Sequence, residues 1–524
     1  MNGLAAFVGT GPGNEELLTV RAAELLSRAD LVVGSPELTQ QFARMIRPGA
    51  QIQDAAELDA DPRLLAKAAK AGQVAVALYS GDPLLYGPAA VPAAACAKAR
   101  VPFEIVPGLP PATAVPAYAG IPLTSDGSGG EVRIVQASDV SRVAADSPLP
   151  ASLVILGVES ASPVDLAKML MAAGWPDTTP FKITWNGTTT EQLTIACRLG
   201  SVGADLKAAG ISLLSEPGPA IGVVGEGAGN GTNLSWYETK PLFGWRVLVP
   251  RTKEQAASVS ERLQGHGAVP EEVPTIAVEP PRTPQQIERA VKGLVTGRYQ
   301  WVAFTSVNAV RAVREKLEEY GLDARAFAGV KVAAVGEQTA KAVQEFGIKP
   351  DLIPEGEQSG EGLAAAWQPY DDLLDPINRV LLPRADIATE TLVARLTELG
   401  WEAEDVTAYR TVRAAPPPAP VREAIKGGGF DAVLFTSSST VRNLIGIAGK
   451  PHAVTVIAAI GPQTAQTAAE YGLRVDVMAP RPSVTALVDA LAEYAAQTRD
   501  AAIAAGEPVR KPSERRRGAR RRLK

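Results

Sequence analysis

The sequence has few of the residues that build disulfide frameworks and metal sites. Its 524 residues include two cysteines, Cys96 and Cys197, and two histidines, His266 and His452. Neither cysteine lies in a paired framework or at a metal-ligand spacing, so we expect both to be reduced core residues, as in a cytosolic protein. Two isolated histidines exclude a multi-histidine site, and we expect no metal.

Long apolar runs and a cationic leader are also missing. No apolar run reaches the roughly 18 residues of a membrane span. The opening MNGLAAFVGTGPGN has no cationic region before its apolar run, unlike a secretory signal. We therefore expect a cytoplasmic protein without a membrane partner. Aromatic residues make up only 5% of the chain, and this composition favours α/β packing over a disulfide scaffold.

Charge is distributed unevenly along the chain. The formal net charge is −5, of which residues 510–524 contribute +8 through nine Lys/Arg and one Glu, so the remaining 509 residues carry −13. Such a basic segment can bind nucleic acid. Because it has no interleaved aromatic residues and the rest of the chain is acidic, we expect a disordered tail over residues 501–524 and no nucleic-acid partner.

An internal repeat fills the second half of the chain. Its two copies alternate short β-branched runs with amphipathic helices, the pattern of a parallel sheet with crossover helices. We expect two similar α/β lobes over residues 243–496, with the Pro-bounded segments PTIAVEPPRTP and VTAYRTVRAAPPPAP as connectors between them. Three motifs recur in the same order: RVLVPRT (from Arg246) and RVLLPRA (from Arg379), VAFTSV (from Val302) and VLFTSS (from Val433), and VAAVGEQTA (from Val332) and IAAIGPQTA (from Ile457).

The first half is α/β as well but does not share the repeat. The stretch LAAFVGTGPGNEELLTVRAAELLSRADLVVG predicts a strand, a Gly-rich turn, a helix and a second strand. A later portion beginning ASLVILGVES predicts a second α/β subdomain. The Gly-rich passage GEGAGNGTNLSWYETKPLFGW predicts a linker, so we place a domain over residues 1–235.

Five segments of the first half carry a family resemblance: VGTGPGNEELLTV, YSGDPLLYG, FEIVPGLPPATAVPAYAGIPLT, TTTEQLTI and PAIGVVGEG. In this order they resemble the tetrapyrrole methylases, and most nearly uroporphyrinogen-III C-methyltransferase. The resemblance implies S-adenosylmethionine held between two α/β subdomains, a tetrapyrrole substrate, and a fold that could form a homodimer through this domain. It implies that the cofactor is lined by Pro12, Ser80, Gly81, Asp82, Leu85 and Leu156.

Several positions depart from that family's pattern. Ser35 in LVVGSPEL stands where the resembled methyltransferases carry an aspartate, which would manage the proton of the methylated carbon. GPAAVP at residues 87–92 replaces a motif with an arginine, and Pro110 and Pro111 replace a Thr-Ala pair. An alternative hypothesis therefore makes this domain a noncatalytic binding or scaffold module.

The duplicated half, with its FTS, AVGEQTA, AYRT, LFTSSS and AIGPQTA segments, resembles uroporphyrinogen-III synthase over residues 243–496. The resemblance implies closure of linear hydroxymethylbilane into a ring with inversion of the last pyrrole, without a cofactor. Loss of hydroxide from the terminal carbon would be helped by a general acid. The resembled family places its candidate acid at the position of Tyr409 in TAYRT, although a packed strand tyrosine would show the same pattern.

Hydroxymethylbilane is a polycarboxylate, so the lobes need groups that receive anions. Strands that stop at Gly336 and Gly461 should expose helix N-termini, whose free amides attract carboxylates. Arg251 and Arg384 occupy equivalent repeat positions and could pair with acetate or propionate arms. The remaining candidates are hydroxyls that could equally cap helices: Thr305, Ser306, Thr339, Ser437, Ser438 and Thr464.

Together these patterns predict a fusion enzyme of tetrapyrrole biosynthesis, with cyclisation in the second half followed by methylation in the first. Adjacent steps on one unstable intermediate give such a fusion a rationale. A third hypothesis treats the two lobes as a small-ligand binding module rather than a synthase.

Overall fold

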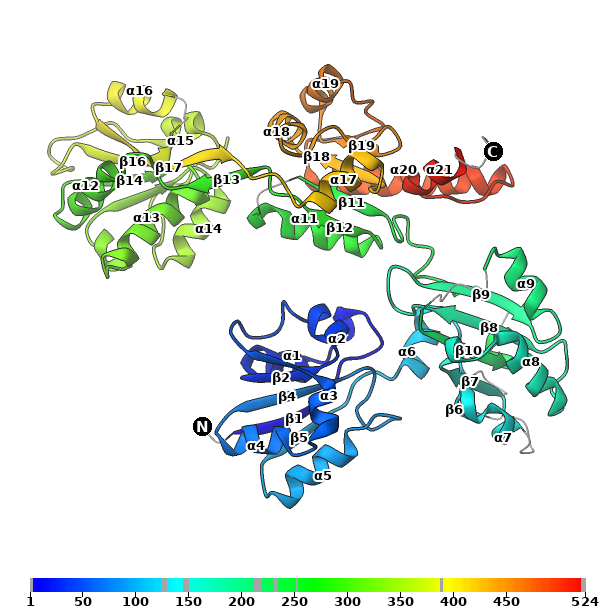
Figure 1. The fold of residues 1–524 in the computed structure, drawn as a ribbon. Coiled ribbons are helices and arrows are strands. Elements are labelled where there is room, and N and C mark those ends of the chain that lie inside the picture. Colours follow the sequence, from blue (N-terminus) through cyan, green and yellow to red (C-terminus); the bar gives the residue numbers. More distant parts are fainter. Residues whose placement is uncertain are drawn as a thin grey trace. The chain divides into compact units, whose positions relative to one another are not determined.

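The structure is a computed structural model that describes residues 3–124, 130–144, 150–211, 218–229, 234–250, 253–386 and 390–519. It divides into two compact units, Met1–Trp245 with Leu263–Val269, and Arg246–Arg262 with Pro270–Lys524. Each unit holds two five-stranded sheets with helices packed on them (Figure 1). The α/β class predicted from the sequence is confirmed.

The first sheet of unit 1 is parallel, with the strand order β3-β2-β4-β1-β5. The interior strand β1, between β4 and β5, is a continuous apolar run because helices cover both faces of the sheet, α1 and α2 on one side and α4 and α5 on the other (Figure 1). The elements are β1 (Leu4–Gly9), α1 (Val20–Arg28), β2 (Leu31–Gly34), α2 (Pro36–Gln41), β3 (Gln51–Asp54), α3 (Ala55–Ala60), α4 (Leu64–Lys70), β4 (Val74–Tyr79), α5 (Ala90–Lys98) and β5 (Phe103–Val106).

The second sheet of unit 1 is mixed, with the order β6-β7-β10-β8-β9, and only β6 and β7 pair in parallel. Helix α6 packs on one face, while α8 and α9 pack on the other with the largest apolar cluster of this subdomain. The elements are α6 (Pro111–Tyr118), β6 (Val132–Gln136), α7 (Val140–Ala144), β7 (Ser152–Leu156), α8 (Pro163–Ala172), β8 (Pro180–Trp185), β9 (Leu193–Arg198), α9 (Val202–Ala208), β10 (Ala220–Gly225) and α10 (Glu226–Gly229).

Unit 2 has the two lobes and the two connectors predicted from the sequence. The first lobe has the strand order β12-β11-β18-β19-β20. Its elements are β11 (Arg246–Val249), α11 (Lys253–Gly265), β12 (Val269–Glu272), α17 (Ala419–Gly427), β18 (Ala432–Phe435), α18 (Ser438–Ala448), β19 (Val456–Ala459), α19 (Pro462–Glu470), β20 (Val477–Met478), α20 (Val484–Ala504) and α21 (Pro512–Ala519).

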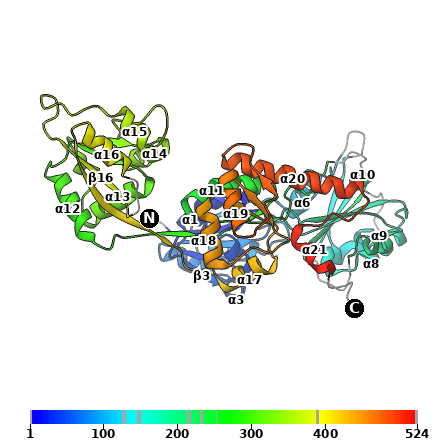
Figure 2. The ribbon, with the colours of Figure 1, turned by 90° about the horizontal axis from the view of Figure 1, so that it is seen from above.

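The second lobe has the strand order β13-β17-β16-β14-β15. Helices α12, α13 and α14 cover one face of its sheet, and α15 and α16 cover the other (Figure 1). Figure 2 shows these helices gathered around β16. The elements are β13 (Ile276–Glu279), α12 (Pro284–Val295), β14 (Trp301–Phe304), α13 (Val307–Glu319), β15 (Lys331–Ala334), α14 (Glu337–Glu345), α15 (Gly360–Ala366), β16 (Arg379–Ala385), α16 (Thr391–Glu398) and β17 (Glu402–Arg413).

The lobes exchange strands between the two copies of the repeat. In the first lobe, β11 and β12 of the first copy join β18, β19 and β20 of the second. In the second lobe, β14 and β15 of the first copy join β16 and β17 of the second. The chain crosses at β13 and returns along β17, and these strands pair in antiparallel register. Each lobe therefore contains one complete set of repeat motifs, drawn from both copies.

The segment expected to be a disordered tail is helical where the structure describes it. Helix α20 continues to Ala504, and α21 follows from Pro512. Pro512 is buried, and the Ser513 amide donates to Asp431 Oδ1 at 2.9 Å. Composition alone could not reveal this contact, because Asp431 lies far away in sequence. Residues 520–524 lie outside the described range.

Candidate functional site

A cavity of about 660 Å³ opens in unit 1 between its two subdomains. The first subdomain contributes the loops that leave the carboxyl ends of β1 and β4, and the second contributes the ends of β7 and β8 and the start of β10. This is the edge of a parallel sheet where ligands usually bind. Its lining includes Thr10, Gly11, Pro12, Gly13, Ser80, Pro111, Gln136, Leu156, Thr184, Asn186, Thr189 and Ile221.

Four glycines let the loops under this cavity meet backbone to backbone. A Cβ on Gly108 would lie 2.0 Å from Gly81 O, and a Cβ on Gly9 would lie 2.5 Å from Gly108 N. Gly81 also exchanges backbone hydrogen bonds of 2.8 and 3.3 Å with Gly11. No other residue fits this contact without moving the backbone, which explains the glycines in the GTGPG, SGDP and VPG motifs.

Only some of the six residues predicted to line the cofactor line the cavity itself. Pro12, Ser80 and Leu156 line the cavity, while Gly81 holds the loop beneath it. The carboxylate of Asp82 accepts hydrogen bonds from the backbone amides of Leu84 at 2.9 Å, Leu85 at 3.0 Å and Gly108 at 3.3 Å, so it fixes the loop geometry. Leu85 is exposed and is not part of the lining.

Sequence reasoning missed the loop after β8, which forms much of the cavity wall. Asn186 and Thr188 have φ values of 47° and 67°, a left-handed conformation that is uncommon for non-glycine residues and is found at functional sites. The Gln192 side chain accepts from Thr188 N at 2.7 Å, and Tyr237 OH donates to Thr188 O at 3.2 Å. These contacts hold the loop in place, but the local sequence NGTTT alone does not predict them.

Ser35, the position of the missing acid, acts as a helix cap. It is the N-cap residue of α2, and its Oγ accepts from Leu38 N at 3.4 Å. Nearby, Tyr79 ends β4 and lines a separate cavity of about 300 Å³. Burial raises the pKa of Tyr79, whose hydroxyl has no hydrogen-bond partner among the described residues. The sequence analysis did not identify the Tyr79 phenol as a candidate functional group.

In unit 2, two predicted site residues from distant segments come into direct contact. Ser306 follows β14 and Tyr409 lies on β17, and their hydroxyl oxygens are 3.0 Å apart. Ser306 also caps α13, accepting from Ala309 N at 3.1 Å. Tyr409 is only 7% exposed and packs in the core of its lobe. The pair lies at the carboxyl ends of strands in a largely parallel sheet.

The equivalent turns of the first lobe form a hydroxyl cluster. Ser437 caps α18 in a capping box with Thr440. Ser438 Oγ donates to the carbonyl of Gln463 at 3.2 Å and accepts from Thr467 Oγ1 at 2.9 Å. These bonds join the starts of α18 and α19. The hydroxyls of both serines therefore lie at one edge of the lobe, where they can cap a helix or contact a substrate.

The two glycine turns expected to receive carboxylates differ. A Cβ on Gly461 would meet nothing within 4 Å, so the start of α19 is open. At Gly336 the added atom would lie 2.5 Å from Gln358 Oε1, which also accepts from Glu337 N at 3.4 Å. Helix α14 therefore begins with its amide covered and with an acidic residue in its first turn, both of which oppose anion binding. Thr339 and Thr464 are buried one turn further on, and Thr305 is half-buried beside Ser306.

Arg384 is already paired with a carboxylate of its own lobe. Its Nε donates to Asp405 Oδ1 at 2.6 Å, and a second, shorter bond completes a bidentate pair. This hydrogen bonding raises the pKa of Arg384. The predicted role in binding substrate carboxylates competes with this pair. The equivalent Arg251 lies outside the described residues.

Removing Asp405 should take a bidentate carboxylate away from a buried guanidinium. The Arg384 side chain is 9% exposed and that of Asp405 is 44% exposed, so we expect Asp405→Ala to lower the free energy of unfolding by about 1–2 kcal/mol, less than for a fully buried pair. Urea unfolding measures the change. Glu402→Ala, which breaks the more exposed pair with Arg379, is the matched control. An unchanged stability together with a lowered KM would instead assign Arg384 to the substrate.

Two family descriptions match the chain, one in each half. Residues 6–203 match Tetrapyrrole (Corrin/Porphyrin) Methylases, and residues 257–489 match Uroporphyrinogen-III synthase HemD. A relative from Ruminiclostridium josui, the porphyrin biosynthesis protein HemD, is 30% identical over 512 residues, covering 94% of this chain and 98% of the relative. The chain belongs to this HemD family. It is therefore a fusion of a methylase part and a synthase part within tetrapyrrole biosynthesis, as predicted from the sequence.

Other relatives match about half of the chain, and they include separate proteins of both kinds. A uroporphyrinogen-III C-methyltransferase of Sinorhizobium sp is 31% identical, over 44% of this chain and 85% of the relative. A uroporphyrinogen-III synthase of Synechococcus elongatus is 29% identical, over 49% of this chain and 98% of the relative. No helix in the described part of the chain has both the length and the apolar character that a membrane span requires.

Proposed function

We propose that this protein closes hydroxymethylbilane to uroporphyrinogen III in unit 2 and methylates that product in unit 1. The observation that carries the synthase half is the 3.0 Å contact between Ser306 and Tyr409, because it brings a phenol and a hydroxyl from distant segments to one sheet edge. The membership of the HemD family supports both halves.

Ring closure requires hydroxide to leave the terminal carbon of the linear substrate and a delocalised cation to form. In the proposed step the Tyr409 phenol gives its proton to the departing oxygen, and Ser306 holds the phenol in position. The phenolate that remains is next to the cation and can stabilise it. We propose that this half needs no cofactor, since the group that must be supplied is a proton.

The carboxylate arms of the substrate would be received at the same edges. The open start of α19 at Gly461 offers free amides, and Ser437 and Ser438 offer hydroxyls beside it. Thr305 and Ser306 would do the same in the other lobe. Because the start of α14 is covered by Gln358, we assign the stronger anion site to α19.

The cavity of unit 1 fits S-adenosylmethionine, which supplies an electrophilic methyl group when bound. Its volume is in the range of small-molecule sites. Thr188 Oγ1 is buried beside it without a partner among the described residues, and a zwitterionic nucleoside would offer acceptors there. We propose that Pro12, Ser80, Leu156, Asn186 and Thr189 hold it, while Asp82 positions the loops.

A cytoplasmic setting and a homodimer complete the proposal. Cys96 and Cys197 are free and buried, and burial raises the pKa of both thiols, which suits a reducing compartment. Exposed apolar side chains at Leu84, Tyr86 and Val91 of unit 1 are the surface that a dimer would cover.

A second candidate makes unit 1 a binding module that does not turn over. The observation that favours it is Ser35, which caps α2 where a proton-managing carboxylate was expected. Under this reading S-adenosylmethionine binds in the cavity but no methyl group reaches the substrate.

Two substrates given separately distinguish these readings. Uroporphyrinogen III with labelled S-adenosylmethionine reports methylation alone, and we expect the label in the tetrapyrrole. Binding of S-adenosylmethionine by calorimetry without label transfer would reject the methyltransferase and support the binding module. Hydroxymethylbilane without S-adenosylmethionine reports cyclisation alone, so failure of one half does not obscure the other.

Charge at the start of α19 should govern substrate affinity. Pro462→Glu gives α19 the acidic first turn that Glu337 gives α14, so we expect KM for hydroxymethylbilane to rise about 3- to 5-fold with kcat unchanged. Raising the ionic strength should shrink the difference. Pro462→Gln is the neutral control, and an equal rise in that variant would assign the effect to loss of proline rather than to charge.

A further inference from the structure

The segment that joins the two halves of the chain is packed within unit 1. We call its described part, residues 234–245, the joining segment. Its sequence predicts a linker, yet Tyr237 is only 6% exposed, and the ring centroids of Tyr237 and Tyr118 are 4.7 Å apart. Trp236 Nε1 also donates to the carbonyl of Ala117 at 3.0 Å. These contacts make the joining segment an ordered part of unit 1.

The carboxylate of Glu238 in the joining segment accepts three hydrogen bonds. Its Oε1 accepts from Gln192 Nε2 at 2.8 Å and from Thr194 Oγ1 at 2.6 Å, and its Oε2 accepts from Thr194 N at 3.2 Å. A side-chain amide can present either its nitrogen or its oxygen to a neighbour, whereas a carboxylate only accepts. Glu238 therefore fixes the orientation of the Gln192 amide, which is only 3% exposed, with its nitrogen toward the joining segment.

The oriented amide holds the loop after β8 at the wall of the cofactor cavity. Gln192 Oε1 accepts from Thr188 N at 2.7 Å, and Tyr237 OH donates to Thr188 O at 3.2 Å. Both backbone groups of Thr188 are thus held by the joining segment, one directly and one through Gln192. The φ of Thr188 is 67°, which is uncommon for a residue other than glycine and needs such support. Thr189, the next residue, lines the cavity.

The Gly-rich loop after β1 lies against the same loop. A Cβ on Gly13 would lie 3.3 Å from Thr189 Cγ2 and 3.5 Å from Thr188 Oγ1. Asn14 Nδ2 donates to the hydroxyl of Tyr118 at 3.1 Å, and Tyr118 packs on the joining segment. A shift of the loop after β8 would therefore change the shape of the cavity on both sides.

We propose that Glu238 is a positioning residue for the binding of S-adenosylmethionine. It does not contact the cofactor but acts through Gln192, which holds the loop at Thr188 in the conformation that the cavity needs. This inference rests on the proposed binding of S-adenosylmethionine in unit 1. It makes the joining segment a working part of the methylase site as well as a connection between the halves.

The test exchanges the two members of this relay in the full chain and measures affinity for S-adenosylmethionine by calorimetry. Gln192→Glu sets a carboxylate against that of Glu238, so we expect the affinity to fall about 10-fold or more. Glu238→Gln leaves one fewer acceptor for the donors of Thr194 and Gln192, so we expect a loss of about 3-fold.

Combining the two substitutions should restore the affinity to within about 2-fold of the wild type. In the double variant the amide at position 238 can donate to the carboxylate at position 192, which still accepts from Thr188 N. Circular dichroism checks the fold of each variant. If Gln192→Glu does not fold, the comparison of Glu238→Gln with the double variant decides, because only a relay predicts that the second substitution improves binding.

The form of the loss separates positioning from partial unfolding. A displaced loop should raise the dissociation constant while each chain still binds one cofactor, and it should raise KM for S-adenosylmethionine more than it lowers kcat. Partial unfolding would instead reduce the number of sites per chain and lower the apparent kcat, with the dissociation constant and KM unchanged.

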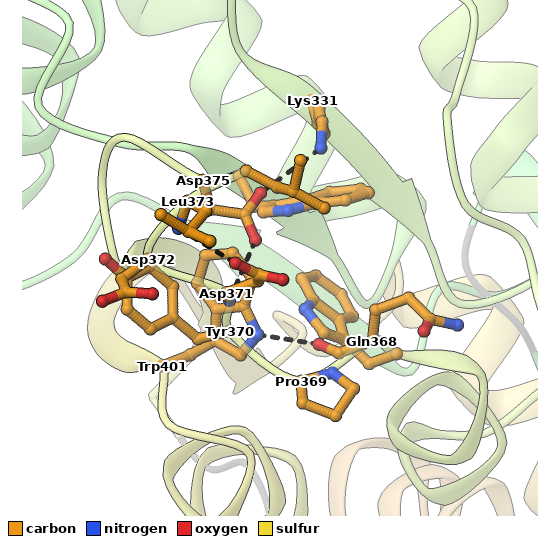
Figure 3. Close-up of a pocket in the computed structure, with 12 residues that line it drawn as sticks. Lys331, Gln368, Pro369, Tyr370, Asp371, Asp372, Leu373, Asp375 and Trp401 are labelled. Atoms are coloured by element: carbon orange, nitrogen blue, oxygen red, sulfur yellow. Dashed lines mark hydrogen bonds and ion pairs between the residues drawn. The ribbon is translucent and has the colours of Figure 1, made fainter.

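A carboxylate that holds a loop in unit 2 provides the matched control. Asp375 is 8% exposed, accepts from Asp371 N at 3.4 Å and pairs with Lys331, whose Nζ lies 3.5 Å from Asp375 Oδ1 (Figure 3). It lines a cavity of about 960 Å³ in the second lobe. Asp375→Asn removes a charge and an acceptor as Glu238→Gln does, but it should leave the affinity for S-adenosylmethionine within about 2-fold.

The outcomes for the inference and for the proposed function can be told apart. If the wild-type protein does not bind S-adenosylmethionine, both the proposed role of unit 1 and the relay are rejected. If the wild type binds it and the double variant binds no better than Gln192→Glu, the relay is overturned and the proposed function stands. Equal affinity of the wild type and all three relay variants would also overturn the relay alone.

Discussion

Tyr409→Phe is expected to lower kcat of cyclisation by about 100-fold or more. The substitution removes the proton that the departing hydroxide needs, and general acid catalysis contributes about 10²- to 10⁴-fold. The ring itself stays packed, because Tyr409 is buried in the core of its lobe and phenylalanine fills the same space. Initial rates with hydroxymethylbilane measure the effect, and KM should change little.

Ser306→Ala provides the matched comparison for this result. It removes the hydroxyl that contacts the phenol and that also caps α13, but it leaves the acid in place. We therefore expect a loss of about 3- to 10-fold in kcat. A folded Tyr409→Phe variant that keeps more than a third of the wild-type rate would remove Tyr409 from the chemistry. A larger loss at Ser306 than at Tyr409 would reverse the proposed roles.

Gly108→Ala is expected to weaken methylation while cyclisation continues. The added Cβ would lie 2.0 Å from Gly81 O and 2.7 Å from Gly9 C, so the loops under the cofactor cavity must separate. Overpacking of this kind costs about 1–3 kcal/mol or more, and we expect affinity for S-adenosylmethionine to fall at least 10-fold. Calorimetry measures the affinity, and cyclisation by the same preparation shows that unit 2 remains folded.

Gly203→Ala is the control in the same unit. It lies in α9, where the added Cβ would make an ordinary 3.5 Å contact with Val164, and alanine is the better helix former. We expect unchanged affinity for S-adenosylmethionine. If Gly108→Ala bound the cofactor normally, the close loop contact would not be what shapes the cavity.

Much of this arrangement was predictable because it follows from strands of a parallel sheet. Carboxyl ends of parallel strands meet at one edge, so the FTS turn and the TAYRT segment could be expected to meet, and Ser306 and Tyr409 do. The glycines of GTGPG and SGDP likewise marked loops in which backbones approach closely. In both cases the contact joins two motifs, each of which can be recognised in the local sequence.

The rest depends on contacts that no local pattern encodes. Gln358 covers the start of α14 from 21 residues away, which breaks the symmetry that two nearly identical motifs suggested. The strained loop at Asn186 and Thr188 is held in part by Tyr237, which lies 49 residues further along the chain than Thr188. The exchange of strands between the two repeat copies could not be predicted either, because equivalent strands have similar sequences whichever copy supplies them.

The most direct test of the central claim is the isomer composition of the product that the purified protein forms from hydroxymethylbilane. Spontaneous closure gives the type I isomer, whereas the proposed reaction at Tyr409 inverts the last ring and gives type III. We predict type III as the main product, with or without S-adenosylmethionine. A product that is type I in both conditions would contradict the assignment of unit 2 as a synthase.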